Sequence, residues 1–245
     1  MSISTEKVPG EPMMLTKNFK DLQKGVKLLV EANCVFQGNY KSSFICCLTG
    51  GKVNHEVIER EYGIPLAISC IAKNILEDLP PGDAPSFFAS LPDAIWCDGK
   101  DLSRVVWQFL AVELRELLPV PAETQAVVAP VIAGMDLLAE GKKWSAHEGR
   151  SAALYAADSV VDLTARGGRW DAESAAEYTA VRAASCAAFA ASHATGNNAR
   201  GDYWSAKRAA LAADWTSMSL YTSRRRQCAT LLRLIKEAPI TQEDN

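Results

Sequence analysis

Apolar and polar residues repeat along most of this 245-residue chain with the spacing of three and four that is typical of amphipathic helices. We find no stretch with the alternating pattern and tight turns expected of a β-sheet. The segment 41–51 alone is ambiguous between a short helix and a brief strand. The pattern predicts an all-α protein, an antiparallel helical bundle or array. The clearest stripes of the first half cover residues 15–30, 54–63, 68–79 and 102–117.

Local signals set the expected helix ends. Asn54 is placed to cap the helix that Gly63 terminates, and Pro80–Pro81 closes the next one. We expect Asp83 to cap a short helix through Phe88 and Asp101 to cap a longer one.

Two prolines give further expectations for the helix that follows. Pro121 fits the first helical position, where its missing N–H costs nothing. Pro130 should kink or split the same helix.

Alanine replaces leucine, isoleucine, valine and phenylalanine from about residue 144 onward. Glycines at 167–168, at 196 and at 201 divide this half into three expected helical segments. Alanine is the best helix former and its small side chain lets helices approach closely. We therefore expect Ala183, Ala187 and Ala191 at a close helix–helix contact. The bulky residues expected to fill the remaining grooves are Tyr155, Trp170, Tyr178, Phe189, Trp204 and Trp215.

A faint repeat marks this alanine-rich half. Trp144, Trp170 and Trp204 each precede Ser or Asp and then Ala, at an expected helix start. Ser145 and Glu148 match a capping box, in which each side chain bonds the backbone N–H of the other. Three solutions to one capping problem explain the repeat better than a duplication does.

The domain organisation follows from these patterns. We expect a disordered lead (1–13), one helical domain (14–240) and a disordered tail (241–245). The domain has a Leu/Ile/Val-packed part (14–143) and an alanine-rich part (144–237), with no long Gly/Ser linker between them.

The location of the protein is also predicted. The first residues lack the apolar stretch of a secretory signal. The most apolar segment, Ala126 to Met135, is too short to span a membrane. We expect a cytoplasmic protein without a membrane partner.

Composition narrows the chemistry. A net charge of −3 gives no general reason to expect nucleic acid as a partner. The seven cysteines form no CxxC pair, so free thiols are expected rather than a zinc or redox site. His55 lies one turn from Glu59 on a predicted helix, a spacing that can bind a metal. No second histidine follows, and solvated charges explain it equally well. We expect no metal and no organic cofactor.

Charged residues of the second half allow two interpretations each. Asp158, Asp162, Arg182 and Arg208 are candidates for buried ion pairs between helices. The basic run 224–226 is either solvated or a nucleic-acid contact, and without a basic domain around it the former is favoured.

The segment 193–204 is long for a helix–helix connection and carries residue types that are common in binding hot spots. A Gly/Asn turn ahead of a helix is the alternative interpretation. The candidate partner-binding residues are Asn197, Asn198, Arg200, Tyr203 and Trp204.

Residues 64–113 and the alanine-rich remainder resemble a family of immunity proteins found in bacterial toxin systems and phage genomes. The resembling features are "LEDLP" at 76–80, then "AI" at 94–95, "GKDLS" at 99–103, and the alanine-rich helices. The resemblance covers about the last three-quarters of the chain, and the family has no catalytic motif to transfer. It implies an all-helical cytosolic module that binds a protein, a toxin or effector, and neutralises it.

Two classes of function therefore remain open. The first is a non-enzymatic binding protein; the second is a helical enzyme whose polar residues converge in a pocket that the sequence does not reveal. The lack of a recognisable catalytic motif favours the first. The partner and the oligomeric state are not specified by the sequence.

Overall fold

The computed structural model describes residues 15–35, 48–49, 54–165, 172–195, 201–217 and 221–241. Within these ranges the regular structure is helical, which confirms the all-α fold. The predicted lead (1–13), most of the ambiguous segment 41–51 and all but the first residue of the predicted tail lie outside the described residues. The helices are α1 (Phe19–Glu31), α3 (His55–Tyr62), α4 (Leu66–Asp78), α5 (Ala84–Ile95), α6 (Val105–Glu116), α7 (Ala122–Ala139), α8 (Ala146–Ala165), α9 (Ala172–Ala194), α10 (Gly201–Thr216) and α11 (Tyr221–Glu237).

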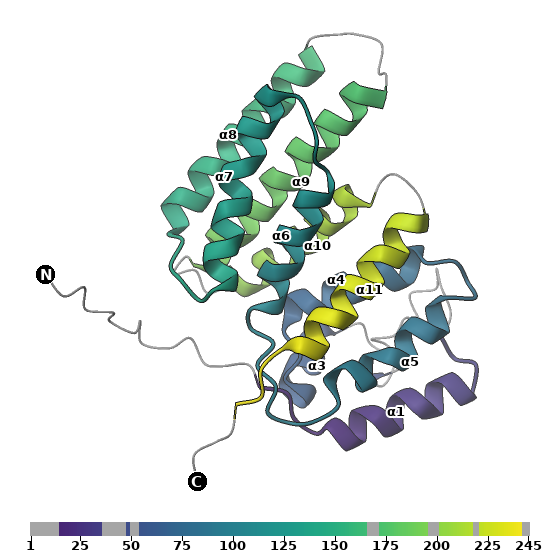
Figure 1. Cartoon of the computed structure of the whole chain (residues 1–245). Helices are drawn as coiled ribbons and strands as arrows, with labels where there is room; N and C mark the ends of the chain where they lie inside the picture. The colour runs from purple at the N-terminus through teal and green to yellow at the C-terminus, as the bar shows by residue number, and fades with distance from the viewer. Residues whose placement is uncertain are drawn as a thin grey trace, which may run out of the picture.

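The helices form two packed groups that share neighbours. In Figure 1, α7, α8 and α9 lie side by side as long rods, and α1, α3, α4, α5 and α11 gather at the other end of the molecule. α10 packs against both α9 and α4, and α6 packs against α7 and α11, so these two helices connect the groups.

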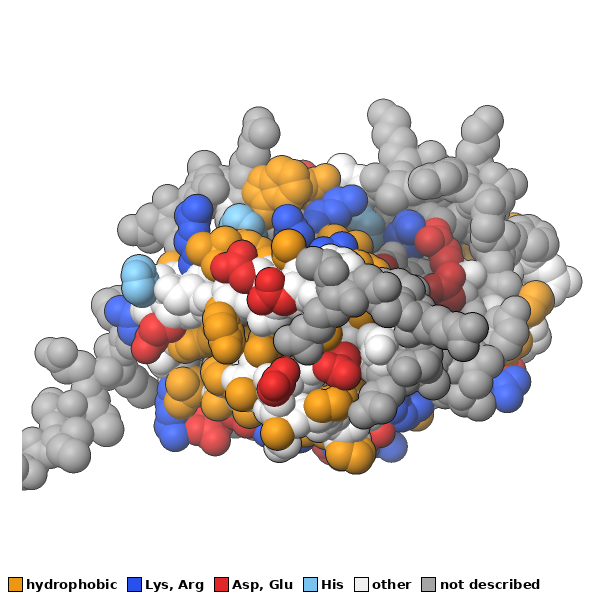
Figure 2. Space-filling view, turned by 90° about the horizontal axis from the view of Figure 1, so that it is seen from above, with side chains coloured by type: hydrophobic (Ala, Val, Ile, Leu, Met, Phe, Trp, Pro, Cys, Tyr) orange, Lys and Arg blue, Asp and Glu red, His pale blue; other side chains and the backbone are white. Residues whose placement is uncertain are grey.

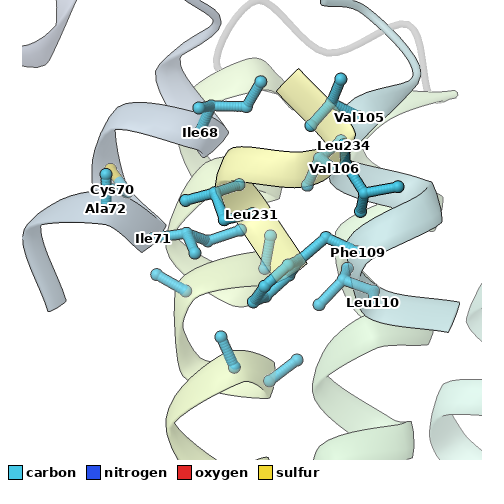
Figure 3. Close-up of a cluster of buried hydrophobic side chains, with 14 of the residues drawn as sticks. Ile68, Cys70, Ile71, Ala72, Val105, Val106, Phe109, Leu110, Leu231 and Leu234 are labelled. Atoms are coloured by element: carbon cyan, nitrogen blue, oxygen red, sulfur yellow. The ribbon is translucent and has the colours of Figure 1, made fainter. Parts of the chain in front are cut away.

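The core of the first group is built from segments far apart in sequence. α11 lies against α4, α5 and α6. Figure 3 shows Leu231 and Leu234 of α11 among side chains of α4 and α6, including Ile71 and Phe109. All four residues are buried, and their burial is the main source of stability for this contact.

The two ends of the described chain meet at one short segment. Thr16 N donates to Lys100 O at 2.9 Å and Thr241 N donates to Gly99 O at 2.8 Å. Gly99 has a φ of 83°, a conformation that glycine adopts without strain. The Lys100 side chain is buried beneath this junction. Its Nζ donates to the carbonyl oxygens of Ala94, Ile235 and Lys236, which end α5 and α11.

α9 is the central helix of the alanine-containing group, because α7, α8 and α10 all pack against it. Its alanines from 180 to 191 are buried around the helix rather than on one face, including the three predicted at a close contact, Ala183, Ala187 and Ala191. Ser185 Oγ donates to Ala153 O of α8 at 3.1 Å, so a side chain of α9 reaches the backbone of its neighbour. Alanine thus permits α9 to be surrounded closely by other helices.

Several predicted caps form as expected. The Asn54 side chain accepts hydrogen bonds from the backbone of Glu56 and Val57, and Gly63 ends α3 with a φ of 66°. Glu148 N donates to Ser145 Oγ at 3.2 Å and Ser145 N donates to the Glu148 carboxylate at 2.8 Å. This reciprocal pair is the predicted capping box.

Three other helix starts differ from prediction. Asp83 makes no capping hydrogen bond to α5, which runs on to Ile95. Asp101 accepts from Ser103 N in a turn that precedes α6. Pro121 is the N-cap of α7 rather than its first residue, and Pro130 does not split that helix. Tertiary packing along the length of α7 outweighs the one lost hydrogen bond.

The last predicted segment also differs, since it is divided into α10 and α11. α10 ends at Thr216, where Thr216 Oγ1 donates to Ala213 O and Ser217 Oγ donates to Asp214 O. Such local side-chain bonds compete with helix continuation. α10 begins at Gly201 and Trp204 lies inside its first turn, so the helix start expected after Trp204 is wrong.

Candidate binding surface

The first turns of α10 display two aromatic side chains to solvent. Tyr203 is 44% exposed and Trp204 is 45% exposed. Their rings meet edge to face at 5.5 Å, and Lys207 Nζ lies 5.6 Å from the centre of the Tyr203 ring. The two rings are therefore held by their mutual contact and by the Lys207 cation over the Tyr203 ring, while much of their apolar surface stays exposed to solvent. We call Tyr203 and Trp204 the α10 aromatic pair.

Where α9 packs against α10, beside the α10 aromatic pair, two arginine side chains lie over aromatic rings. The Arg182 guanidinium lies 5.0 Å from the Trp215 ring and 5.8 Å from the Tyr178 ring. The Arg208 guanidinium lies 5.2 Å from the Phe189 ring. The ring faces carry negative partial charge and so hold both cations. We call Arg182, Arg208 and the aromatic rings beneath them the α9–α10 seam.

His193 continues the seam toward the end of α9. Its ring stacks on Phe189, with 6.5 Å between ring centres. Burial lowers the pKa of His193, and the nearby Arg208 and Arg150 cations lower it further. His193 is therefore neutral at physiological pH and adds no positive charge to a seam that already carries two guanidinium groups.

The electrostatics of the seam are unbalanced. Neither Arg182 nor Arg208 has a carboxylate partner among the residues that the structure describes, and Arg182 Nε is buried without a hydrogen-bond partner there. Burial raises the pKa of the Cys186 thiol between them, and both arginines act against that rise. Figure 2 shows one face of the molecule, on which Lys, Arg and His side chains lie beside hydrophobic ones and on which Asp and Glu side chains are also present.

The predicted buried ion pairs across these helices are wrong. Asp158 and Asp162 are exposed on α8, whereas Arg182 and Arg208 lie partly buried against aromatic rings. A ring face shields a guanidinium without requiring a carboxylate to leave water, which is costly. Of the predicted groove fillers, Tyr155 and Trp204 are instead exposed, and Trp170 lies outside the described residues.

A second polar cluster lies where α11 meets α4, α6 and α10. Arg224 is 5% exposed and pairs with Asp78 and Asp214. Arg225 Nε donates to Asp83 at 2.5 Å. The basic run therefore forms a network of ion pairs between helices, with Arg224 buried and Arg225 still largely exposed to solvent.

Arg226 completes this network against a buried carboxylate. Glu113 is fully buried, and its Oε2 accepts from Arg226 at 2.9 Å and from Gln227 at 3.1 Å. Burial raises the pKa of Glu113, and the Arg226 cation opposes that rise. Because α11 supplies the cations and three other helices supply the acids, this cluster positions α11 rather than offering groups to a ligand.

The residues considered for a metal are engaged elsewhere. Glu59 accepts from Leu66 N at 2.9 Å and so caps α4. His55 Nδ1 and Ser69 Oγ lie 2.9 Å apart, and the Ser69 hydroxyl donates to Leu66 O. Burial, then Lys73 and Lys207, lowers the pKa of His55 to about 4. The described residues include no group of three possible metal ligands.

Two further features bear on ligands and location. The apolar cavity lined by Leu22, Ile58 and Leu91, among others, has a volume of about 10 Å³, the size of a single water molecule at most. Among the described helices, α7 has the length and apolarity of a membrane span, and 44% of it is buried inside the protein.

The five predicted partner-binding residues divide into two groups. Tyr203 and Trp204 stand on α10 as the exposed aromatic pair, whereas Asn197, Asn198 and Arg200 lie outside the described residues. The seam residues Arg182 and Arg208 were not predicted as binding residues. The spacing 182, 186, 189 and 193 on one helix face, beside 204, 208 and 215 on the next, is a signal that could have found them.

Comparison with known proteins adds no family or relative. No protein-family model, no curated protein and no solved structure matches the chain.

Proposed function

We propose that this protein acts in the cytoplasm by binding another protein, and that it does so through the α10 aromatic pair and the α9–α10 seam. One observation carries the proposal: exposed Tyr203 and Trp204 stand beside cations that lack carboxylate partners among the described residues. Trp, Tyr and Arg are the residue types that dominate binding energy at protein interfaces.

The partner that best fits the sequence is a toxin or effector. Residues 64–113 and the alanine-rich helices resemble immunity proteins of bacterial toxin systems and phage genomes. This resemblance implies that the protein neutralises a toxin or effector by direct contact. The other polar clusters give no comparable support for an enzyme: the Glu113 cluster is occupied by its own salt bridges, and His55 and Glu59 bond to α4.

The proposal is tested by photo-cross-linking followed by affinity measurement. A benzoylphenylalanine placed at position 204 should capture a protein in cells of the native host. The same group at position 155 is the matched control, because Tyr155 is also an exposed aromatic residue, 59% exposed, but lies on α8. The captured protein is then purified and titrated with the parent protein and its variants.

The expected result is a clear division between the variants. Trp204→Ala and Tyr203→Ala should each lose roughly thirtyfold in affinity, the loss typical of a hot-spot residue, while Tyr155→Ala keeps the parent value. Melting temperatures equal to that of the parent establish that the variants are folded. If Trp204→Ala and Tyr203→Ala both bind within twofold of the parent, the surface is not the binding site. If no protein is captured and a small molecule is turned over instead, the enzyme alternative is correct.

A further inference from the structure

We infer that the α9–α10 seam is a carboxylate-binding surface, and that the protein bound there presents an acidic segment to Arg182 and Arg208. This inference rests on the proposed function and specifies the chemistry of the partner.

Most other arginines in the described chain are matched to acids. Arg60, Arg115 and Arg233 each pair with a nearby carboxylate, and so does every member of the run 224–226. Arg104 donates to the carbonyl oxygen of Glu140, and Arg150 is exposed on α8. Arg182 and Arg208 have aromatic rings instead. The chain has acids enough to neutralise them, since Asp158 and Asp162 stay exposed on the adjoining helix α8. The seam therefore keeps two partly buried guanidinium groups that no described carboxylate neutralises.

The stacking geometry leaves the right groups available. A guanidinium that lies over a ring uses its face for that contact, whereas its N–H donors point outward in its own plane. Those donors match the two oxygens of a carboxylate, which can accept two parallel hydrogen bonds. Arg182 Nε is buried without a hydrogen-bond partner in the described structure, so the fold itself does not satisfy all the donors of this guanidinium.

The position of the two cations adds a second reason. Both act on the same buried thiol, Cys186, and Arg208 also acts on His193 together with Arg150. The Asp214 carboxylate acts on Cys186 with the opposite sign, but it is itself paired with Arg224, so cations outnumber free acids among the described groups here. Like charges gathered in this way repel one another, and an anion placed among them relieves that repulsion. The adjacent α10 aromatic pair supplies apolar contact area beside the charged seam, so the whole surface fits a protein segment that mixes acidic and apolar residues.

Nucleic acid is the other anionic partner to consider, and the geometry of the α10 aromatic pair disfavours it. The Tyr203 and Trp204 rings meet at 78° and Lys207 lies over one of them, so they do not form the parallel open faces on which bases stack.

The experiment uses the full chain and three probes of known composition. A labelled peptide of alternating glutamate and alanine is titrated into the protein at neutral pH and low salt. The same peptide with glutamine in place of glutamate and an oligothymidylate of equal net charge are titrated alongside. The arginine Nε–H signals of the parent are followed by nuclear magnetic resonance, which reports binding without any substitution.

The glutamate peptide should bind more tightly than the other two probes, more weakly at high salt, and should shift the Arg182 and Arg208 signals. Arg182→Gln and Arg208→Gln should each weaken it about tenfold. Arg208→Lys should recover part of the loss, because it keeps the charge without the planar donors. Arg233→Gln is the matched control, since Arg233 is an exposed arginine of α11 that already pairs with Glu237.

The inference is overturned if the glutamate peptide does not bind, if the glutamine peptide binds equally well, or if the oligothymidylate binds more tightly. It is also overturned if Arg208→Gln and Arg233→Gln retain the same affinity. The proposed function fails separately. A captured partner that loses affinity to Trp204→Ala but not to Arg182→Gln or Arg208→Gln supports the surface and refutes its preference for carboxylates.

Discussion

Replacing Ala187 with leucine tests the packing on which the α9–α10 seam depends. Ala187 is fully buried in α9, the helix that α7, α8 and α10 surround. Leucine puts a branched side chain where a methyl group now fits between helices. Overpacking of this kind costs about 1–3 kcal/mol, because neighbouring side chains and backbone must shift.

The expected effect is measurable by thermal unfolding. For a protein of this size, 1 kcal/mol corresponds to about 2–4 °C, so the melting temperature should fall by roughly 2–12 °C. Far-ultraviolet circular dichroism follows the loss of helix directly. Ala176→Leu is the matched control, because Ala176 is an exposed alanine of the same helix. An exposed substitution of this kind changes stability by no more than about 0.5 kcal/mol.

Two results would refute the reasoning. One is an unchanged melting temperature for Ala187→Leu, which would mean that the helices around α9 leave room for a larger residue. The other is an equal decrease for Ala176→Leu, which would assign the effect to helix propensity rather than packing. A cooperative transition with a lower midpoint for Ala187→Leu alone supports close packing around α9.

Three further substitutions test other parts of the structure. Arg224→Ala should lower the free energy of unfolding by about 2–3 kcal/mol, because it leaves the partly buried Asp214 without its cation. Urea titration measures this change. A change near zero would contradict a role for the pair in holding α11. Burial raises the pKa of Glu113, so the contribution of its protonated form to stability is full below the ordinary pKa of about 4.3 and is lost as pH rises through the raised pKa. Glu113→Gln should flatten that part of the plot of unfolding free energy against pH. An unaltered plot would show that Glu113 titrates normally. Gly134→Ala should lower the melting temperature, because a Cβ there would lie 2.5 Å from the Trp144 ring. An unchanged melting temperature would mean that the ring moves without cost.

Helix identity and several helix ends could be predicted because their causes are local. A capping side chain such as Asn54 or Ser145 acts within one turn of itself, and the spacing of apolar residues is a property of the segment alone. The failures have causes outside the segment. Asp83 caps nothing because Arg225, more than a hundred residues later, binds its carboxylate at 2.5 Å.

The candidate binding surface was predictable only in part for the same reason. Tyr203 and Trp204 could be singled out by residue type, since exposed aromatic residues beside a loop are typical of binding sites. Helical spacing could have placed Arg182 and Arg208 near aromatic residues, but the sequence does not say which arginine meets an acid. Arg182 and Arg208 face aromatic rings across two helices, whereas Arg226, also in a helix, reaches the buried Glu113.

The sequence by itself therefore determined the helices, the closeness of their packing around alanine, and the residue types available for binding. The tertiary structure alone decided which charges are neutralised within the fold and which remain for a partner. The physical reason is that helix formation depends on neighbours within a few residues, whereas the energy of a charge depends on everything within a few ångströms, whatever its distance along the chain.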